Sequence, residues 1–139
     1  MQPIKDQHSC GACWAFAANT AAEGTLAKKT NSPNNVIHMS EQQIVDCTLG
    51  EKYGGQKFDR PDDDLPAKDY NGRGCSGAWM WYAWEFQKDH GVILEDDYPY
   101  VSGRTGNETD CVHDMSNVYG YISHWTQMSS VAHMKNVVQ

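Results

Sequence analysis

Long apolar runs and an excess of basic residues are both missing from this sequence. No stretch approaches the roughly 20 consecutive apolar residues of a membrane-spanning helix. Lys and Arg number 11 against 18 Asp and Glu, which gives a formal net charge of -7 at pH 7. Proteins that bind nucleic acid need cations to neutralise its phosphates. We therefore expect neither a membrane protein nor a nucleic-acid-binding protein.

The first residues also lack the basic start and apolar core of a secretion signal. Internal repeats and low-complexity segments are absent too. What is present is the composition of a folded domain: 139 residues, of which 40% are hydrophobic and 21% charged. This length is sufficient for one domain with a modest core.

The number of cysteines is odd, because the chain contains Cys10, Cys13, Cys47, Cys75 and Cys111. Two disulfides would leave one thiol over, and such a cysteine is a candidate reactive thiol. The alternative is a buried free cysteine that acts as a small hydrophobic residue. A zinc site would need a second closely spaced pair, and the later cysteines stand apart. Disulfides, if they form, indicate folding in an oxidising compartment.

Strong helix formers predominate from residue 12 to about residue 29, which predicts a long helix. Its apolar stripe is expected to consist of Trp14, Ala17 or Ala18, Ala21 and Leu26.

Ser40 and Gln43 form a capping-box pattern, in which the Ser40 hydroxyl accepts from the Gln43 amide and the Gln43 side chain reaches back. A short helix is therefore expected to lead to Cys47. Residues 49–73 are polar and rich in Gly, Asp, Lys and Pro, which predicts a loop. Its three adjacent carboxylates at 62–64 do not match the ligand spacing of an EF-hand, so a solvated loop is favoured over a calcium site.

Helical spacing returns at residues 77–90, with Gly91 as the expected C-cap. The apolar face of this helix is expected to hold Met80, Ala83, Trp84 and Phe86.

Further along, Pro99 favours an extended conformation at residues 98–100. Asn107 begins an Asn-Glu-Thr triplet, a possible N-glycosylation site in a secretory setting. Alternation over residues 119–125 predicts a strand, and a helix is expected to begin at Ser129 or Ser130.

Cys13 is expected at the start of the first long helix, where unpaired N–H groups and the positive end of the helix dipole stabilise a thiolate. The thiolate is the nucleophilic form of cysteine. Gln7 lies just upstream, and its side-chain amide could donate to a developing oxyanion.

The segment Cys10-Gly11-Ala12-Cys13-Trp14 matches a known signature, Cys-Gly-[Ser/Ala]-Cys-[Trp/Tyr], at every position. On this basis the chain resembles the papain family of cysteine proteases. Three further segments are similar to motifs of that family and follow in its order: Ser-Glu-Gln-x-x-x-Asp-Cys at 40–47, Gly-Cys-x-Gly at 74–77 and Tyr-Pro-Tyr at 98–100.

The resemblance implies an α+β, two-lobe papain-like fold. Residues 1–114 would form most of the helical lobe, and residues 115–139 would begin the β-barrel lobe, which would then be truncated. It implies disulfides between Cys10 and Cys75 and between Cys47 and Cys111, so that the leftover thiol is the catalytic one.

The resemblance also implies roles for individual residues. Cys13 would be the nucleophile and Gln7 the oxyanion-hole donor. The substrate-binding residues would be Gly77, Ala78, Trp79 and Met80. Gly77 would let the substrate backbone lie close, and Trp79 and Met80 would lie beside the pocket for the second residue before the cut bond. The alternative for Trp79 and Met80 is that they belong to the helix core.

The implied reaction is peptide hydrolysis through an acyl-enzyme, without a cofactor. The implied partners are peptide or protein substrates, with a propeptide or a protein inhibitor as further partners. The implied location is lysosomal, vacuolar or extracellular.

Three departures from the family pattern affect the expected activity. The family's His and Asn follow the nucleophile by about 130–150 residues, and only 126 residues (139 − 13) follow Cys13. We therefore expect the chain to end before this His, and the isolated chain not to hydrolyse peptides. His8 stands where the family usually has Gly, and Ala78 replaces the second Gly of the turn.

Two other functions remain as alternatives. One is a non-catalytic family member that binds peptides or a partner. The other is a thiol redox protein, because Cys10 and Cys13 also form a Cys-x-x-Cys pair. The polar residues before Cys10 do not resemble the buried strand that should precede such a pair.

Overall fold

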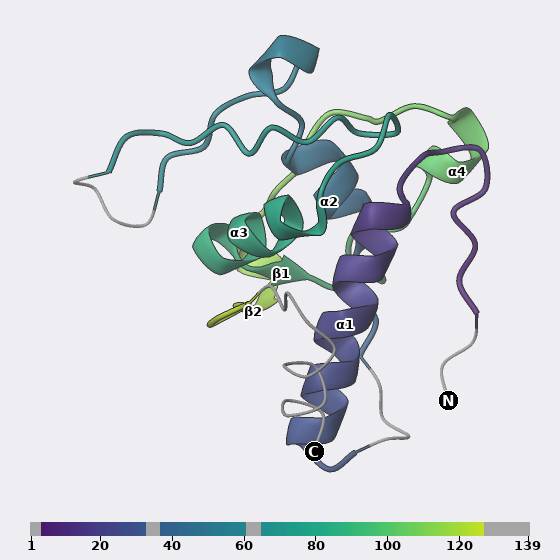
Figure 1. Ribbon diagram of the computed structural model, residues 1–139, viewed down its shortest axis with the longest axis vertical. Coiled ribbons are helices and arrows are strands. Elements are labelled where there is room, and N and C mark those ends of the chain that lie inside the picture. Colours follow the sequence, from purple (N-terminus) through teal and green to yellow (C-terminus); the bar gives the residue numbers. More distant parts are fainter. Residues whose placement is uncertain (1–3, 33–36, 61–64, 127–139) are drawn as a thin grey trace.

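The computed structural model describes residues 4–32, 37–60 and 65–126. Helices predominate in it, and its two short strands pair antiparallel. In chain order the elements are α1 Cys13–Lys29, α2 Glu41–Cys47, η1 Glu51–Tyr53, α3 Met80–His90, β1 Val92–Ile93, α4 Ser102–Thr105, η2 Met115–Asn117 and β2 Val118–Gly120. Figure 1 shows α1 as the long axis of the molecule, with α2 and α3 beside its first half and α4 near its start.

Helix α1 begins at Cys13, as its sequence predicts, and its buried face is more polar than expected. Trp14 and Ala18 are buried, but Ala21 is exposed. Asn19 and Glu23 are buried in its place. The predicted apolar stripe is therefore wrong at Ala21, because hydrogen bonds to other elements make polar side chains suitable for burial there.

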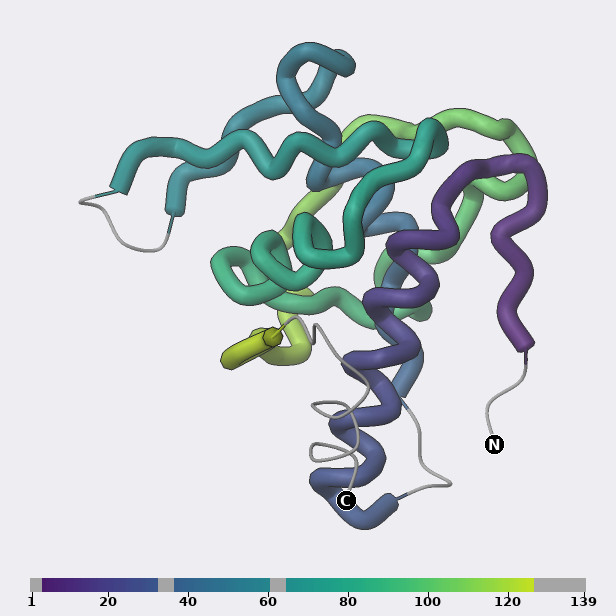
Figure 2. The backbone as a smooth tube through the Cα atoms, in the orientation of Figure 1, coloured from purple at the N-terminus to yellow at the C-terminus, as the bar shows by residue number. Residues whose placement is uncertain are grey.

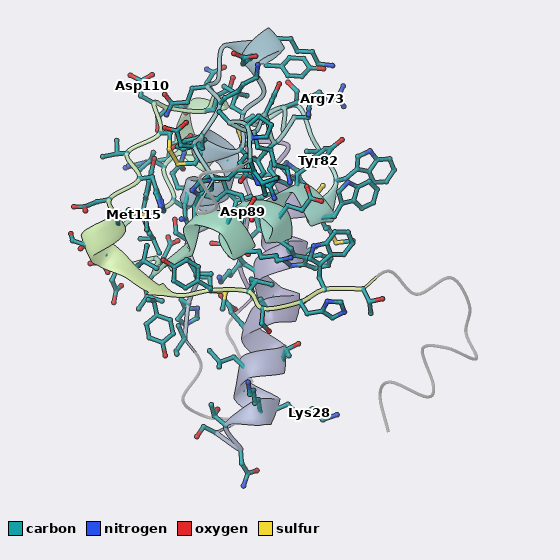
Figure 3. All side chains as sticks on the ribbon, turned by 90° about the vertical axis from the view of Figure 1, so that its left-hand side faces the viewer. Lys28, Arg73, Tyr82, Asp89, Asp110 and Met115 are labelled. Atoms are coloured by element: carbon teal, nitrogen blue, oxygen red, sulfur yellow. A yellow bond between two sulfur atoms is a disulfide. The ribbon has the colours of Figure 1, made fainter. Side chains whose placement is uncertain are left out.

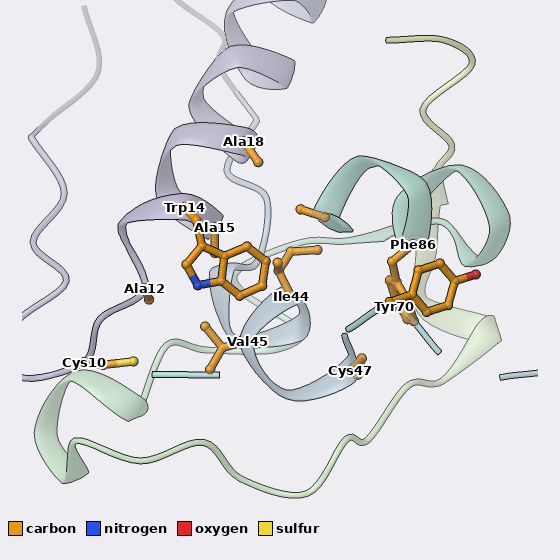
Figure 4. Packing of buried hydrophobic residues seen from close by; sticks show 11 residues of the cluster. Cys10, Ala12, Trp14, Ala15, Ala18, Ile44, Val45, Cys47, Tyr70 and Phe86 are labelled. Atoms are coloured by element: carbon orange, nitrogen blue, oxygen red, sulfur yellow. The ribbon is translucent and has the colours of Figure 1, made fainter. Parts of the chain in front are cut away.

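The hydrophobic core joins α1, α2 and α3 (Figure 4). Trp14 lies against Ile44 and Val45 of α2, and Phe86 of α3 packs edge-on against Tyr70 at 5.1 Å between ring centroids. The indole N–H of Trp14 donates to the Gly74 carbonyl at 3.3 Å. A buried polar atom of a large aromatic side chain is thereby satisfied.

Every residue of α2 is buried, although three of its seven are Glu or Gln and one is Asp. The Gln42 side chain accepts from the backbone N–H groups of Val101 and Ser102 at 2.8 and 3.0 Å. Asp46 accepts from the Thr109 N–H and the Tyr98 hydroxyl at 2.7 and 2.9 Å. The helix thus supplies hydrogen-bond partners to the irregular segment that follows β1.

The capping box at the start of α2 is half formed. The Ser40 hydroxyl accepts from the Gln43 amide at 2.9 Å, as predicted. The Gln43 side chain does not reach back; it donates to the Gly91 carbonyl and accepts from the Ile93 N–H, both at 3.0 Å. Ser40 N–H instead donates to the Ile93 carbonyl at 2.9 Å. Tertiary partners at β1 have replaced the local ones.

Helix α3 begins at Met80, three residues later than the sequence pattern suggests. Gly77 has a φ of +84°, in the left-handed region that favours glycine, and Trp79 is extended. The helix ends as expected at Gly91, whose N–H donates to the Gln87 carbonyl. Ala83 and Phe86 are buried, but Met80 is 40% exposed, so it is not part of the buried face.

The second half of the chain is less regular than its alternation suggests. Strand β2 covers only Val118–Gly120 and pairs with β1, so the strand predicted at 119–125 is shorter and begins earlier. The helix expected from Ser129 or Ser130 and the three carboxylates at 62–64 lie outside the described residues. None of the helices in the described segments is long and apolar enough to cross a membrane.

The segment before α1 runs back along this helix (Figure 2) and is fastened by a buried ion cluster. Lys5 Nζ lies 3.0 Å from Glu23 of α1 and 2.6 Å from Glu41 of α2. Glu23 also accepts from the Met39 N–H at 2.8 Å. Burial raises the pKa of Glu41, and Lys5 opposes this increase. The cluster holds three segments of the chain together.

A further carboxyl, Glu95, lies near this cluster and accepts from the Tyr100 N–H at 2.9 Å. Its other oxygen is buried without a hydrogen-bond partner in the described structure. Burial raises the pKa of Glu95 from 4.5 to about 7, and Glu41 adds to the increase. The groups that face it are Lys5, Glu41, Asp96 and Tyr100.

We predict that Glu95→Gln changes how stability depends on pH. Glu95 binds its proton more tightly in the folded chain, so its contribution is present below about pH 4.5 and is lost as pH rises through 7. The free energy of unfolding of the variant minus that of the wild type should increase from pH 4.5 to pH 7, by on the order of 2 kcal/mol. Urea denaturation at several pH values measures this difference. A difference that stays constant with pH would contradict the assignment.

Candidate active site

Cys13 is the only free cysteine of the chain, and its side chain is exposed at the first position of α1. Ala12 is the N-cap residue and makes no side-chain capping bond. Unpaired N–H groups of the first turn therefore lie at the end of the helix that carries the Cys13 sulfur. The alternative of a buried, inert cysteine is wrong, because Cys13 is exposed.

Gln7 is held in the turn that leads into α1. Its side-chain amide donates to the Cys10 carbonyl at 3.0 Å, and its own carbonyl accepts from the Tyr100 hydroxyl at 2.9 Å. Tyr100 in turn packs edge-on against Phe16 at 5.0 Å between ring centroids. An amide NH2 group has two N–H donors, so one remains for a ligand while the other stays on Cys10.

His8 has a φ of +50°, in the left-handed region that favours glycine. Its N–H donates to the Asp6 side chain at 2.7 Å, and its ring lies 3.4 Å from the same carboxylate. The imidazole is exposed, as is the Asp6 carboxylate. His8 thus makes a local surface turn.

The two disulfides join Cys10 to Cys75 and Cys47 to Cys111, the pairings that the resemblance implies. The first fastens the segment before Cys13 to the turn before α3. There the Gly11 N–H donates to the Cys75 carbonyl at 2.9 Å, and a Cβ on Gly11 would collide with this carbonyl oxygen. Since Cys10 is bonded to Cys75, Cys10 and Cys13 do not form a dithiol pair, which argues against a redox function.

The segment from Gly77 to Met80 lies at the surface next to this disulfide. A Cβ added to Gly77 would meet no atom within 4 Å, so the space beside its backbone is open. Trp79 is 61% exposed and stacks on Trp81 at 4.8 Å between ring centroids. Met80 is 40% exposed. The alternative that Trp79 and Met80 belong to the core is therefore wrong.

No hydrogen bond of a histidine among the described residues involves Cys13. His90 is buried beside Tyr70, whose hydroxyl lies 2.9 Å from its Nε2 and donates to Asp89 at 2.8 Å. Burial lowers the pKa of His90 to about 4, and His113 adds to this effect. Burial also lowers the pKa of His113. His133 lies outside the described residues.

Asn107 is exposed, and its side-chain amide donates to the Thr105 carbonyl at 3.2 Å.

A separate apolar groove of about 430 Å³ lies between α1, Trp84 and residues 119–126, and neither Cys13 nor Gln7 lines it. No group of three or more potential metal ligands occurs among the residues that the structure describes.

Comparison with known proteins shows the family. The model of the papain family of cysteine proteases matches residues 1–139. Digestive cysteine proteinase 3 of Homarus americanus is 38% identical over 99 residues, which are 70% of this chain and 24% of the relative. Cathepsin S of Rattus norvegicus is 33% identical over 114 residues, which are 82% of this chain and 27% of the relative.

A solved structure, digestive procathepsin L 3 of the Tenebrio molitor larval midgut, superimposes with a TM-score of 0.62 at 28% identity. The match covers 88% of this chain and 32% of that one. The chain thus spans about a quarter of the curated relatives and a third of this structure.

The chain belongs to the papain family of cysteine proteases. Its described residues have the architecture of the helical lobe of the α+β papain fold. The resemblance in the sequence is confirmed in both respects.

The residues that position the candidate site were not among those predicted from the sequence. Lys5, Glu23 and Glu41 fasten the segment that carries Gln7, and Tyr100 holds the Gln7 carbonyl. The Tyr-Pro-Tyr motif was a signal for Tyr100. No signal marks Lys5, because a single lysine in a polar segment has the pattern of a solvated residue.

We predict that one thiol, that of Cys13, reacts with iodoacetamide in the folded and unreduced chain. The other four cysteines are oxidised in disulfides and have no thiol to react. Intact-mass measurement should show one carbamidomethyl group, located on Cys13 by peptide mapping. The Cys13→Ser variant should take up none. Uptake of three or more groups would contradict the pairing, and no uptake would contradict the exposure of Cys13.

Proposed function

We propose that the protein hydrolyses peptide bonds, with the thiolate of Cys13 as nucleophile. The observation that carries this proposal is the state of the five cysteines. Four are used in disulfides, and the fifth is free and exposed at the N-terminus of a 17-residue helix. A helix N-terminus favours the anionic form of sulfur, which is the form that attacks a carbonyl.

In the proposed reaction, the Cys13 sulfur attacks the carbonyl carbon of the scissile bond. The free N–H of the Gln7 amide and the Cys13 backbone N–H donate to the resulting oxyanion. The acyl-enzyme forms as the amine leaves, and water then releases the acid product. A histidine beyond the described residues would protonate the leaving amine, as in the Cys-His arrangement that cysteine proteases share.

The substrate would lie along Gly77, Ala78, Trp79 and Met80. The open space beside Gly77 supports a close approach of the substrate backbone. The exposed faces of Trp79 and Met80 support an apolar contact for the second residue before the cut bond. Ala78 is half-buried, and its extra methyl group relative to glycine would narrow the groove.

Further proposals concern the surroundings of this chemistry. Two disulfides support folding in an oxidising compartment, lysosomal, vacuolar or extracellular. There Asn107, which is exposed, would be open to glycosylation. We propose peptides or proteins as substrates, and a propeptide or protein inhibitor as a further partner. We also propose that the helical lobe extends to residue 114 and that the β-barrel lobe begins at residue 115.

The second candidate is a non-catalytic member of the family that binds peptides. It would use the same surface, and the exposed Trp79 supports it equally. The free thiol of Cys13 favours the protease, since binding alone does not need it.

We predict that Cys13→Ser abolishes peptide hydrolysis by the native protein isolated from its source. Gln7→Ala should lower kcat by about 100- to 1,000-fold, the usual effect of removing one oxyanion donor, with little change in KM. Fluorogenic peptides with an apolar second residue before the dye provide the assay. The matched controls are Ala17→Ser on the exposed face of α1 and Gln56→Ala in the exposed loop.

Hydrolysis that survives in Cys13→Ser would overturn the proposal. Binding of the same peptides without any hydrolysis by the wild type would favour the non-catalytic candidate. For the 139-residue chain alone we expect no turnover.

A further inference from the structure

A pocket beside the proposed substrate segment carries positive charge, although the chain as a whole has a net charge of -7. The pocket has a volume of about 520 Å³. Its lining includes Lys52, Tyr53, Arg73, Gly77, Trp79 and Tyr82. Lys52 and Arg73 are the charged residues of its lining.

Neither cation is neutralised by an ion pair among the described residues. Arg73 Nε donates to the Gly77 carbonyl at 3.3 Å. This bond holds the guanidinium beside the substrate segment and does not use its two terminal nitrogens. Lys52 Nζ lies 5.0 Å from the centre of the Tyr53 ring. Desolvation raises the pKa of the Tyr53 hydroxyl, but the neighbouring cations Lys52 and Arg73 together bring this pKa below its ordinary value, so both cations lie close to one hydroxyl.

The carboxylates nearest in sequence to these cations are engaged elsewhere. Glu51 pairs with Lys57 Nζ at 2.9 Å. Asp69 accepts from the Asn71 N–H at 2.9 Å and from the Glu51 N–H at 3.4 Å. Neither carboxylate lines the pocket. Within the part of the chain that the structure describes, the two cations therefore remain available to an anionic group that enters from outside.

We propose that this pocket selects peptide substrates with Asp or Glu as the third residue before the scissile bond, and that Arg73 and Lys52 set this preference. The proposal rests on the proposed function, in which the substrate backbone follows Gly77 to Met80. A peptide whose second residue contacts Trp79 and Met80 advances about 3.3 Å per residue when extended. Its next residue then reaches the pocket, where the planar guanidinium of Arg73 can bind a carboxylate through two N–H groups.

Trp79, which lines this pocket, is stacked on Trp81, and the two rings form a flat apolar surface. They would contact the methylene groups of a glutamate while its carboxylate faces Arg73 and Lys52. Figure 3 shows Arg73 near Tyr82 at one end of the molecule and Lys28 at the far end of α1, so Lys28 provides a control cation outside the pocket.

The test measures binding separately from hydrolysis. Capped pentapeptides X-Leu-Gly-Gly-Gly, with X as Glu, Gln or Lys, are titrated by calorimetry into the Cys13→Ala variant of the native protein at low salt. Glu should bind about three- to tenfold more tightly than Gln, and Lys more weakly than Gln, because two exposed charge pairs contribute modestly. The preference should decrease as added salt screens the charges.

Each single variant, Arg73→Met and Lys52→Met, should reduce the Glu-over-Gln preference, and the double variant should remove it. Lys28→Met should leave it unchanged. All of these positions are exposed, so the variants should fold, and their circular dichroism spectra provide the check. Equal affinity for Glu and Gln in the wild type would overturn the inference. A preference that survives the double variant would also overturn it.

Hydrolysis by the active protein, measured with the same X series on fluorogenic peptides, separates the two proposals. If no peptide is cut but the Glu preference in binding remains, the protease fails and the pocket assignment holds for a peptide-binding protein. If peptides are cut at equal kcat/KM for Glu and Gln, and bind equally, the protease holds and the pocket assignment fails.

Discussion

The arrangement of this chain depends on the burial of one short helix with polar side chains. All seven residues of α2 are buried, and Gln42, Gln43 and Asp46 provide side-chain partners to backbone groups of other segments. A buried amide or carboxylate that lost these partners would cost several kcal/mol. The segments at residues 91–93, 101–102 and 109 therefore have to close around α2 in the register that satisfies it. This part of the chain has few backbone hydrogen bonds of regular secondary structure. The side chains of α2 bond its backbone groups instead.

The same constraint extends to the candidate site through Glu41. This residue shares Lys5 with Glu23 of α1, so the segment before Cys13 is fastened to two helices at once. Further along, the Tyr100 hydroxyl and the Cys10–Cys75 disulfide hold Gln7 and the turn before α1. The Cys13 side chain takes part in none of these contacts and is exposed. A rigid surround with an exposed thiol is the arrangement that nucleophilic catalysis requires, because the nucleophile must meet its substrate while its neighbours stay fixed.

Those parts of the structure that depend on local chemistry could be predicted from the sequence. Cys13 begins α1, Ser40 caps α2 and Gly91 ends α3, because helix formers and capping groups act within a few residues. Features that depend on distant partners could not. The Gln43 side chain could accept from the Ser40 N–H, three residues earlier, as in a capping box. It instead binds Gly91 and Ile93, which are distant in the sequence.

The candidate site divides in the same way. The position of Cys13 followed from the sequence, whereas the burial of Glu23 depends on Lys5 and the Met39 N–H, which approach it from other segments. The cationic pocket was not predictable either. Lys52 and Arg73 belong to a stretch with the composition of a solvated loop, and only the fold brings them to one cavity beside Trp79.

Two of the titratable groups, Glu95 and His90, respond to pH in opposite directions. Glu95, with a pKa raised to about 7, binds more protons in the folded state, so its contribution decreases as pH rises between 4.5 and 7. His90, with a pKa lowered from 6.5 to about 4, binds more protons in the unfolded state, so its contribution decreases as pH falls through that range. Between about pH 4.5 and 6.5 the two slopes oppose each other. Of these two groups, only His90 contributes a slope below this interval and only Glu95 above it, so their joint contribution to stability is largest at mildly acidic pH. Burial also raises the pKa values of Glu41 and Asp46, which therefore act in the direction of Glu95, and lowers the pKa of His113, which acts in the direction of His90.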